Sequence, residues 1–513
     1  MANPALPYGY VPKTKLYKHQ IVGIEELERH NAYGLFDQMG LGKTLELLYM
    51  ALDSIRGGRF DCALIVCKSS HARVWTKHIT EHAPNTAYHS IIGKAPAVRK
   101  QAWPLKYPLY LVNYELLSRT IATEKRRRET VKKGEEIFTL PNGVCVLGDD
   151  AANLRILLRN RRVAIILDES QAMKNHTAKV TGVLHGLAKY ATHRYIATGT
   201  PVAERPDDLW SQIHFLDDGA LLGRSYWRFI SIYADFVTVR GRRWIKRYRH
   251  LDDLRNKVKS ISIRRTKDQC LDLPPKTYEE EHLTAVGMQK TMMSNLRTEM
   301  KNVLMAMSSR QLTLQKGTSF SKCFQDMQRV AAMPCVIDPN CKVSAKFNAL
   351  VDYMESMNGD QIVVWCVNKD VTTAVAEQLN SKKGAHTAIE VHGGIPVGKQ
   401  RDQRIDAFIG GRYRALVATM GTLREAVTLT NAQHAFYMQL DFQLTNWAQS
   451  QDRIHRIGTT GTVVINTPML LGSLDTYIHD HLLEKEQYAT GSTDHKVIVL
   501  SKQGLLKTLK KGG

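Results

Sequence analysis

The sequence predicts two α/β domains in tandem, each built on a parallel sheet covered by helices. At 513 residues the chain exceeds the size at which one hydrophobic core stops growing, so two or three domains are expected. Short apolar runs alternate with longer amphipathic stretches, a pattern typical of parallel strands joined by helical crossovers. This alternation occurs in two series, separated by a region without strand signals.

Each series supplies its own set of buried strands. The first contains YGLFDQ, CALIVC, LYLVNY, VAIILD and RYIATG, at 33–38, 62–67, 109–114, 163–168 and 194–199. The second contains QIVVWCV, HTAIEVHG, RALVAT and HAFYMQ, at 361–367, 386–393, 414–419 and 434–439. Helical spacers such as VTTAVAEQLN separate them. We therefore expect one sheet from each series.

The region between the two series is predicted to be helical. Leu283 to Val330 has Met and Leu at helical spacing, which favours core filling over a ligand site. The double proline in DLPPKT, Asp272 to Thr277, marks a break before it. The domains are predicted at 1–282 (first lobe, with a basic insertion near 217–262), 283–340 (helical protrusion or linker), 341–482 (second lobe) and 483–513 (a basic, frayed tail).

The charge of the chain indicates a polyanionic partner. Its formal net charge is +22, which favours nucleic acid over an anionic membrane surface, although a generally basic protein remains the alternative. The eight cysteines form no C-x-x-C pair, so neither a zinc site nor a disulfide framework is predicted. The N-terminus lacks an apolar signal core, and we expect a soluble protein of the cytoplasm or nucleoid of a bacterium or an infected host cell.

The segment DQMGLGKT, 37–44, is typical of a phosphate-binding loop. It follows a predicted strand and begins a helical pattern, as such a loop requires. Glycines let backbone N–H groups approach phosphate, and the helix N-terminus adds positive potential. The predicted contacts to ATP come from Met39, Gly40, Leu41, Gly42, Lys43 and Thr44, with Lys43 on the β- and γ-phosphates and Thr44 on Mg²⁺. The alternative is a plain glycine turn before a helix.

A second strand end supplies two adjacent carboxylates. In AIILDE, Asp168 and Glu169 follow four apolar residues. Asp168 fits a ligand of the Mg²⁺ shell, and Glu169 fits the base that orients and activates the attacking water. A solvated acidic pair is the alternative, and the phosphate loop upstream makes it the weaker interpretation.

Motifs in a fixed order make the chain resemble the Swi/Snf-type ATPases of superfamily 2. The resemblance extends from about Leu16 to Ile457. It rests on LYKHQ, DQMGLGKT, ALIVCKSSHARVW, LDESQAMKN, YIATGTPVAERPDDLWSQIHFL, IRRTKDQCLDLPPKT and WAQSQDRIHRIG. The family-specific part is R-R-T-K followed by L-P-P-K. The resemblance implies two RecA-like lobes with helical protrusions, ATP and Mg²⁺ as cofactors, and DNA as partner.

The resemblance also implies roles for individual residues. Gln20 would read adenine, and the coupling residues would be Thr198, Gly199, Thr200 and Gln449. Contacts to nucleic acid are implied for Lys68, His392, Thr419 and Gly421. Arg453 and Arg456 would act as arginine fingers from the second lobe. Such a finger is useful when it comes from a moving part, because it then stabilises the transition state only when the lobes close on ATP. A basic surface stripe is the alternative for these two arginines.

The chain departs from the family pattern at several positions. Ser170 and Gln171 replace the usual A-H, which puts the link from that motif to the second lobe in doubt. ATMGTLREAVTLTNA lacks a double glycine, and Leu444 to Asn446 stands in place of W-N-P. These departures predict a compact, divergent member, similar to those of bacteriophages and bacteria.

Two basic stretches lie outside these motifs. VRGRRWIKRYRH, 239–250, interleaves basic residues with Trp244 and Tyr248 where the family inserts a helical protrusion. We expect DNA-backbone contacts from Arg242, Arg243, Trp244, Lys246 and Arg247. A solvated turn is the alternative. TEKRRRETVKKGEE, Thr123 to Glu136, is expected to be an exposed, mobile insertion, because its acids offset its bases.

The combined expectation is a DNA-dependent ATPase. It would translocate on duplex or branched DNA with little sequence preference, as a monomer without zinc or membrane contact, and remodel forks or drive branch migration in replication, recombination or repair. The alternatives are a strand-separating DNA or RNA helicase and, in another class, a non-catalytic nucleic-acid clamp. Nucleosome remodelling is not expected.

Overall fold

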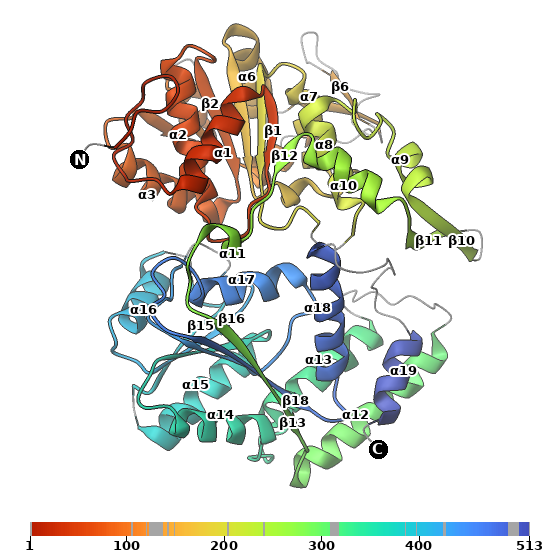
Figure 1. Ribbon diagram of the computed structural model, residues 1–513. Coiled ribbons are helices and arrows are strands. Elements are labelled where there is room, and N and C mark those ends of the chain that lie inside the picture. Colours follow the sequence, from red (N-terminus) through yellow and green to blue (C-terminus); the bar gives the residue numbers. More distant parts are fainter. Residues whose placement is uncertain are drawn as a thin grey trace. The chain divides into compact units, whose positions relative to one another are not determined.

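The chain folds into two compact units that divide after Leu271 (Figure 1). The computed structural model describes residues 3–511 except 104–105, 120, 123–136, 141–142, 148, 203–204, 240–241, 308–317, 385, 397, 424–426 and 491–501. The predicted insertion at 123–136 therefore lies outside the described residues. Each unit is described by itself below.

Unit 1 is built on a seven-stranded parallel sheet, as the first series of apolar runs predicts. The strand order is β12-β1-β9-β8-β2-β4-β3, and every pairing is parallel. The strands are β1 (Ala32–Leu35), β2 (Cys62–Cys67), β3 (Tyr88–Ser90), β4 (Leu109–Asn113), β8 (Val163–Asp168), β9 (His193–Ala197) and β12 (Ser262–Ile263). The two short strands β3 and β12 lie at the edges and have no counterpart among the predicted runs.

Helices cover both faces of this sheet. Leu27 of α1, Leu47 of α2 and Trp75 of α3 are buried in one apolar cluster with side chains of β1, β2, β4, β8 and β9. Helix α8 contacts β1 and β9, and α7 packs on α5, α6 and α8. The helices are α1 (Lys18–Arg29), α2 (Lys43–Arg56), η1 (Ser69–His71), α3 (Ala72–His82), α4 (Pro96–Ala102), α5 (Tyr114–Arg119), α6 (Asp149–Asn160), η3 (Ser170–Met173), α7 (Lys179–Ala188), α8 (Asp208–Asp217), α9 (Tyr226–Tyr233), α10 (Leu251–Lys259) and α11 (Lys267–Cys270).

The basic stretch at 239–250 forms a β-hairpin, which corrects the expectation of a helical protrusion there. Strand β10 (Ala234–Val239) pairs antiparallel with β11 (Arg242–Tyr248) between α9 and α10. Val237, Ile245 and Trp244 are residue types that favour strands, and this local preference prevails over the family analogy. A separate three-stranded sheet has the order β5 (Ile121–Ala122), β7 (Gly143–Leu147), β6 (Ile137–Leu140).

Unit 2 is built on a six-stranded parallel sheet. Its order is β13-β18-β17-β14-β16-β15, with β13 (Lys276–Leu283), β14 (Ile362–Cys366), β15 (Ala388–Val391), β16 (Ala415–Thr419), β17 (His434–Tyr437) and β18 (Val463–Leu470). Strand β13 was not predicted, because its centre is Glu279–Glu281 and lacks an apolar run. Since β13 pairs with β18, the boundary expected at 282 is wrong, and the second unit begins at Asp272.

The helices of unit 2 also lie on both faces of its sheet. Those of one face are α12 (Gly287–Ala306), α13 (Ser319–Ala332), α16 (Lys399–Ile409), α17 (Leu444–Ile454), α18 (Asp475–Thr490) and α19 (Lys502–Lys511). Those of the other face are α14 (Ala345–Ser356) and α15 (Lys369–Lys383). A 3-10 turn, η4 (Pro334–Val336), precedes α14. The predicted helical region at 283–340 is therefore mostly α12 and α13, and both helices are part of the unit's core.

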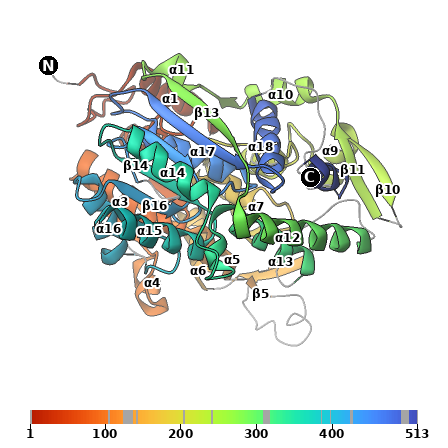
Figure 2. The same cartoon turned by 90° about the horizontal axis from the view of Figure 1, so that it is seen from below.

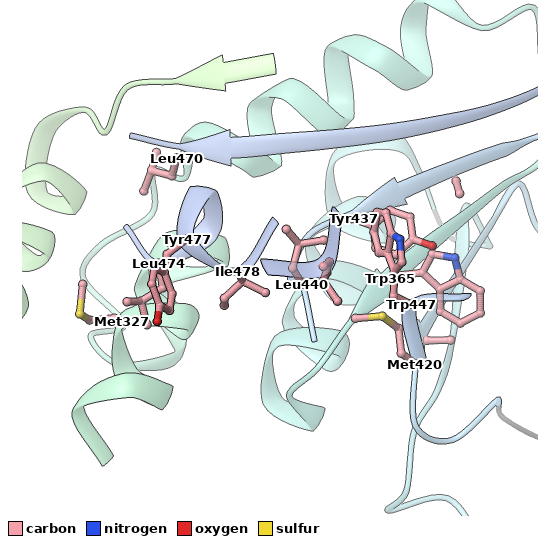
Figure 3. Close-up of a cluster of buried hydrophobic side chains, with 14 of the residues drawn as sticks. Met327, Trp365, Met420, Tyr437, Leu440, Trp447, Leu470, Leu474, Tyr477 and Ile478 are labelled. Atoms are coloured by element: carbon pink, nitrogen blue, oxygen red, sulfur yellow. The ribbon is translucent and has the colours of Figure 1, made fainter. Parts of the chain in front are cut away.

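Aromatic and methionine side chains fill the larger core of unit 2 (Figure 3). The rings of Tyr437 and Trp447 are 4.5 Å apart between centroids, and the Tyr437 hydroxyl bonds Ser450 Oγ at 2.6 Å. Met293, Met300 and Met327 are all buried in this cluster. These three methionines fill the core as predicted, whereas Met288 and Met305 of α12 are exposed.

The C-terminal segment is not a frayed tail. Helix α19 contacts α12 and α18, and its Leu505 and Leu509 are buried in the core of unit 2. The boundary at 483 also falls inside α18. The prediction failed because the lysines of KQGLLKTLKK outweigh its apolar residues in composition, whereas the leucines at i and i+4 form one packed stripe. No helix of the part described here is long and apolar enough to cross a membrane.

We predict that the substitution Glu28→Gln stabilises unit 1 at alkaline pH. Glu28 is 6% exposed, and burial, followed by the neighbouring Asp53 charge, raises its pKa from 4.5 to about 9. The folded state therefore keeps a proton that the unfolded chain releases, so stability falls as pH rises from about 4.5 to about 9. An amide avoids this loss, and we expect a gain of about 1–3 kcal/mol at pH 8.5 and little change at pH 4.5.

The measurement is urea unfolding of both proteins at the two pH values. The exposed Glu25 on the same helix gives the control, Glu25→Gln, with no pH-dependent gain expected. An equal pH dependence in the wild type and Glu28→Gln would show that Glu28 ionises normally.

Candidate nucleotide site

The predicted phosphate loop lies between β1 and α2 and depends on two glycines. Gly40 and Gly42 have φ values of +85° and +88°, a left-handed conformation that disfavours other residues. A Cβ at Gly42 would also lie 2.3 Å from Gln20 Nε2. Helix α2 begins at Lys43, so its unpaired N–H groups border the loop. This is the geometry expected of an anion-binding loop at a helix N-terminus.

Gln20 braces this loop from helix α1. Its Oε1 accepts the Tyr17 N–H at 3.0 Å, and its Nε2 donates to the Leu41 carbonyl at 3.3 Å. The neighbouring His19 Nε2 also bonds the Leu41 carbonyl, at 2.9 Å. The predicted adenine reader is therefore placed directly against the phosphate loop. Its contact with adenine stays a prediction.

Lys43 is held over the loop by backbone carbonyls. Its Nζ donates to Asp37 O at 2.7 Å and to Gln38 O at 3.2 Å. Thr44 follows in the first turn of α2 and is half-buried. A phosphate group would replace these weak carbonyl partners with charged oxygens, which an ammonium prefers.

A buried ion cluster anchors the start of the loop. Arg265 Nε donates to Asp37 Oδ1 at 3.0 Å and Oδ2 at 2.9 Å, and its Nη2 contacts both Asp37 and Glu46, the latter at 2.9 Å. Asp37 and Glu46 have no exposed surface. Burial raises the pKa of Glu46 to about 8, and the Arg265 charge opposes this increase.

Sequence reasoning missed this cluster, although both ends were in quoted motifs. Asp37 and Arg265 are 228 residues apart, and only the fold joins DQMGLGKT to IRRTK. The same two strings meet again where Gln38 Oε1 accepts the Lys267 N–H at 2.8 Å. The sequence held one signal for this cluster: Asp37 and Arg265 have opposite charges and stand in two motifs of the family.

Asp168 lies at the end of β8 in a buried pocket of donors. Trp75 Nε1 donates to its Oδ2 at 2.8 Å, and the Tyr114 hydroxyl donates to its carbonyl at 2.9 Å. Burial raises the pKa of Asp168, while the His71 charge opposes this effect. A carboxylate that is costly to ionise alone is stabilised by a dication, which fits the predicted Mg²⁺ role.

Glu169 adopts a left-handed backbone with φ at +55°, an uncommon conformation for a non-glycine residue. Gln171 Nε2 donates to its Oε2 at 2.5 Å. Burial alone would raise the pKa of Glu169, but the charges of His71, Lys68 and Lys43 outweigh it and the net direction is downward. Glu169 is thus held ionised, as a base must be, and the two adjacent carboxyls have opposite shifts.

The predicted coupling motif packs on the phosphate loop. The Thr198 N–H donates to the Leu35 carbonyl at 3.2 Å, and the Thr200 N–H donates to Thr198 Oγ1 at 3.0 Å. At Gly199 a Cβ would lie 2.4 Å from Met39 Cγ and 3.1 Å from Met39 N. Only a glycine permits this close approach, so a shift of either segment is felt by the other.

Ser170 has a role within unit 1. It is fully buried, and its hydroxyl donates to Gln212 Oε1 at 2.7 Å; Gln212 Nε2 in turn donates to the Pro201 carbonyl at 2.9 Å. The residues that depart from the family pattern therefore connect the acidic motif to the segment after Thr200. A histidine at 171 was expected from the family, and here Gln171 bonds Glu169 instead.

The predicted arginine fingers belong to unit 2. Arg453 lies in the last turn of α17, and its Nη1 donates to the Val427 carbonyl at 3.5 Å. Arg456 follows the helix, and burial lowers the pKa of its guanidinium while Asp452 opposes this. Gln449 is buried, and among the described residues no partner bonds its Oε1. The action of these three residues on a nucleotide stays a prediction.

The predicted DNA contacts differ in their placement. Lys68 precedes η1, and its charge helps to lower the pKa of Glu169. Gly421 is exposed. Thr419 is buried and bonds Thr422 Oγ1 at 2.6 Å. His392 is 5% exposed, its Nδ1 accepts the Gly394 N–H at 3.0 Å, and burial lowers its pKa. The contact of His392 with nucleic acid stays a prediction.

On the hairpin, Arg242, Arg243 and Trp244 lie in β11, whose first three side chains are outside the described set. Lys246 and Arg247 are exposed, and Arg247 Nε donates to Asp235 Oδ2 at 2.5 Å. Tyr248, the other aromatic residue of this basic stretch, is 3% exposed and donates its hydroxyl to Asp207, so its ring is not available to DNA.

We predict that Arg265→Ala destabilises unit 1 by about 3–5 kcal/mol, because it leaves the buried Asp37 carboxylate without its counter-charge and the buried Glu46 carboxyl without its hydrogen-bond partner. The measurement is chemical unfolding at neutral pH. Arg29 gives the control, since its pair with Glu26 is at the surface and its side chain is 64% exposed. Arg29→Ala should change stability by less than about 0.5 kcal/mol. Equal effects of the two substitutions would contradict the structural role of the cluster.

Taken together, the residues of unit 1 fit a nucleoside triphosphate with Mg²⁺. The loop glycines and the α2 N-terminus are suited to phosphate oxygens, Lys43 to their charge, and Thr44 and Asp168 to the metal. Bound there, Mg²⁺ supplies charge neutralisation of the phosphoryl group being transferred.

Comparisons with known proteins identify the family of the chain. The SNF2-related domain model matches residues 20–334, and the helicase conserved C-terminal domain model matches 345–458. The chain is 24% identical over 495 residues to Zorya protein ZorD of Escherichia coli, covering 91% of this chain and 43% of that protein. It is also 24% identical to the human DNA annealing helicase and endonuclease ZRANB3, covering 94% of this chain and 40% of that protein.

The chain thus spans about two fifths of the length of these curated relatives. Among solved structures, it aligns with the Sulfolobus solfataricus SWI2/SNF2 ATPase core in complex with dsDNA at 20% identity and a TM-score of 0.41. The alignment covers 98% of this chain and 97% of that chain. The SNF2-related model alone matches more than half of the 513 residues. The chain belongs to the Swi/Snf-type family of DNA-dependent ATPases within superfamily 2.

Proposed function

We propose that the chain is an ATP-dependent DNA translocase that remodels duplex or branched DNA, by fork remodelling or branch migration in replication, recombination or repair. The observation that carries this proposal is the contact between the coupling motif and the phosphate loop, Gly199 against Met39. A change in the phosphates can thereby move the segment that leads to the basic hairpin. The relative ZRANB3, named a DNA annealing helicase, is consistent with this function.

The residues of unit 1 divide the chemistry as follows. Lys43 and the loop N–H groups would bind the phosphates, Thr44 and Asp168 would hold Mg²⁺, and Glu169 would orient the attacking water and take its proton. The opposite pKa shifts of Asp168 and Glu169 suit a metal ligand and a base, respectively. Arg453 and Arg456 would act as arginine fingers that stabilise the charge of the transition state.

The predicted boundaries of the motor are revised: the first lobe ends at Leu271, and the second lobe also includes α12, α13 and α19. We propose ATP and Mg²⁺ as the cofactors, DNA as the partner through backbone contacts, and a monomer as the active form.

The decisive experiment for the function compares ATP hydrolysis on single-stranded, duplex, forked and four-way DNA, and on RNA. The proposal expects stimulation by duplex DNA and stronger stimulation by forks or junctions. Stimulation by single strands with strand separation would favour a helicase. A complete absence of hydrolysis with every nucleic acid would favour a non-catalytic clamp.

We predict that Glu169→Gln binds ATP with near-normal affinity but hydrolyses it about 10²- to 10⁴-fold more slowly, because the amide cannot take a proton. Lys43→Ala should also abolish turnover, but through weakened nucleotide binding, and should leave salt-sensitive DNA binding intact. Fluorescent-nucleotide binding and single-turnover hydrolysis separate the two effects. A near-normal rate for Glu169→Gln would assign the base to another residue.

We predict that the triple substitution of Arg242, Arg243 and Lys246 by Ala lowers the DNA stimulation of ATP hydrolysis and makes DNA binding less salt-dependent, since each lost phosphate contact reduces the salt slope. Basal hydrolysis without DNA should be unchanged. Unchanged stimulation would show that the hairpin is only a solvated turn.

A further inference from the structure

Helix α9 carries an exposed tryptophan that the proposed function has not used. Trp227 is 68% exposed, more than any other aromatic side chain whose burial the structure describes. By contrast, Trp75, Trp103, Trp210, Trp365 and Trp447 are all buried. A large apolar ring at the surface is unfavourable in water and is typical of a contact site.

The indole is held in place by a rigid aromatic group. The rings of Tyr226 and His176 stack with centroids 3.5 Å apart at 14°, and Trp227 meets Tyr226 edge-on at 5.4 Å and His176 at 6.2 Å. The Tyr226 hydroxyl donates to Asp207 Oδ2 at 2.7 Å. Trp227 is therefore preorganised, and binding through it costs little side-chain entropy.

The same carboxylate joins this group to the basic hairpin. Asp207 also accepts the Tyr248 hydroxyl of β11, and the Arg249 N–H donates to the Tyr233 carbonyl at the end of α9, at 2.8 Å. Both views show α9 beside the hairpin (Figures 1 and 2). Contacts made by α9 and by the hairpin therefore belong to one rigid surface.

The charge around Trp227 is positive. Arg224 and Arg228 are exposed on either side of it in the chain, and residues 224–233 contain no acid. On the hairpin side, Lys246, Arg247 and Arg249 are exposed, with Asp235 bonded to two of them. This excess of guanidinium and ammonium groups complements a phosphate backbone.

We propose that Trp227, Arg224 and Arg228 bind DNA at an unpaired base, with the indole stacked on the base and the guanidiniums on the flanking phosphates. Bases within a duplex are stacked on one another, so an aromatic side chain at a protein surface finds a free base face only where the duplex opens. The substrate class is thus DNA with a junction between duplex and single strand. This inference rests on the proposed function and specifies its substrate.

The position of the group connects it to the nucleotide site. His176 follows the acidic motif on the segment after η3, and Asp207 follows Thr200 at the start of α8. A base stacked on Trp227 would press on both segments through rings already in contact. We therefore expect junction DNA to stimulate hydrolysis more than plain duplex, by way of this group.

The test measures binding without nucleotide, to forked DNA with 2-aminopurine at the first unpaired position and to duplex DNA with 2-aminopurine paired. The wild type should quench the fluorophore in the fork. Trp227→Ala should weaken fork binding by about 5- to 100-fold and leave duplex binding unchanged. Trp227→Phe should recover most of the loss, because it keeps an aromatic face.

Ile232→Ala gives the matched control, since Ile232 is also exposed on α9, at 43%. It should bind both DNAs as the wild type does, and unchanged melting temperatures would show that the variants fold. Equal fork affinity of Trp227→Ala and wild type, or an equal loss on fork and duplex, would overturn the inference and leave a protein partner as the occupant of this surface. Since ATP is absent, a failure of hydrolysis on all DNA would contradict the proposed function without affecting this result.

Discussion

The nucleotide site depends on a single buried guanidinium. Arg265 bonds Asp37 at the start of the phosphate loop, Glu46 in α2 and the His19 carbonyl in α1, so three segments that surround the loop share one cation. The ion pair is sheltered from water, where its charges attract more strongly and where an unpaired partner is costly. Without it, the left-handed turns at Gly40 and Gly42 would have no fixed starting point. The segment before Arg265 also forms β12, which pairs with β1 beside the loop.

Around this anchor, the site is organised by close contacts rather than by many charges. Gly199 lies so close to Met39 that there is no room for a side chain at position 199. Ser170 reaches Gln212, and Gln212 reaches Pro201, so the acidic motif and the coupling motif move together. Such interlocked packing has few intermediate arrangements, which is what a two-state motor requires. Glu169, next to Ser170, has a left-handed backbone of a kind that is concentrated at functional sites.

The two sheets and the first half of the site were predictable because their signals are local. Apolar runs such as CALIVC and VAIILD define buried strands whatever surrounds them, and Gly40, Gly42 and Lys43 need only their neighbours to form a loop. The features that could not be predicted from the sequence depend on contacts between residues far apart in the chain. Strand β13 exists because β18 accepts it, although its centre is three glutamates. Helix α19 is packed because two leucines find the core of unit 2, and Arg265 matters because Asp37 is 228 residues away.

The proposed mechanism requires that Arg453 and Arg456 stabilise the transition state of ATP hydrolysis. The most direct test is single-turnover hydrolysis by Arg456→Ala and Arg453→Ala on saturating duplex DNA, with nucleotide affinity measured on the same samples. The mechanism predicts a loss of about 10³-fold or more in the hydrolysis rate, with ATP affinity largely retained. Wild-type hydrolysis by both variants would contradict it.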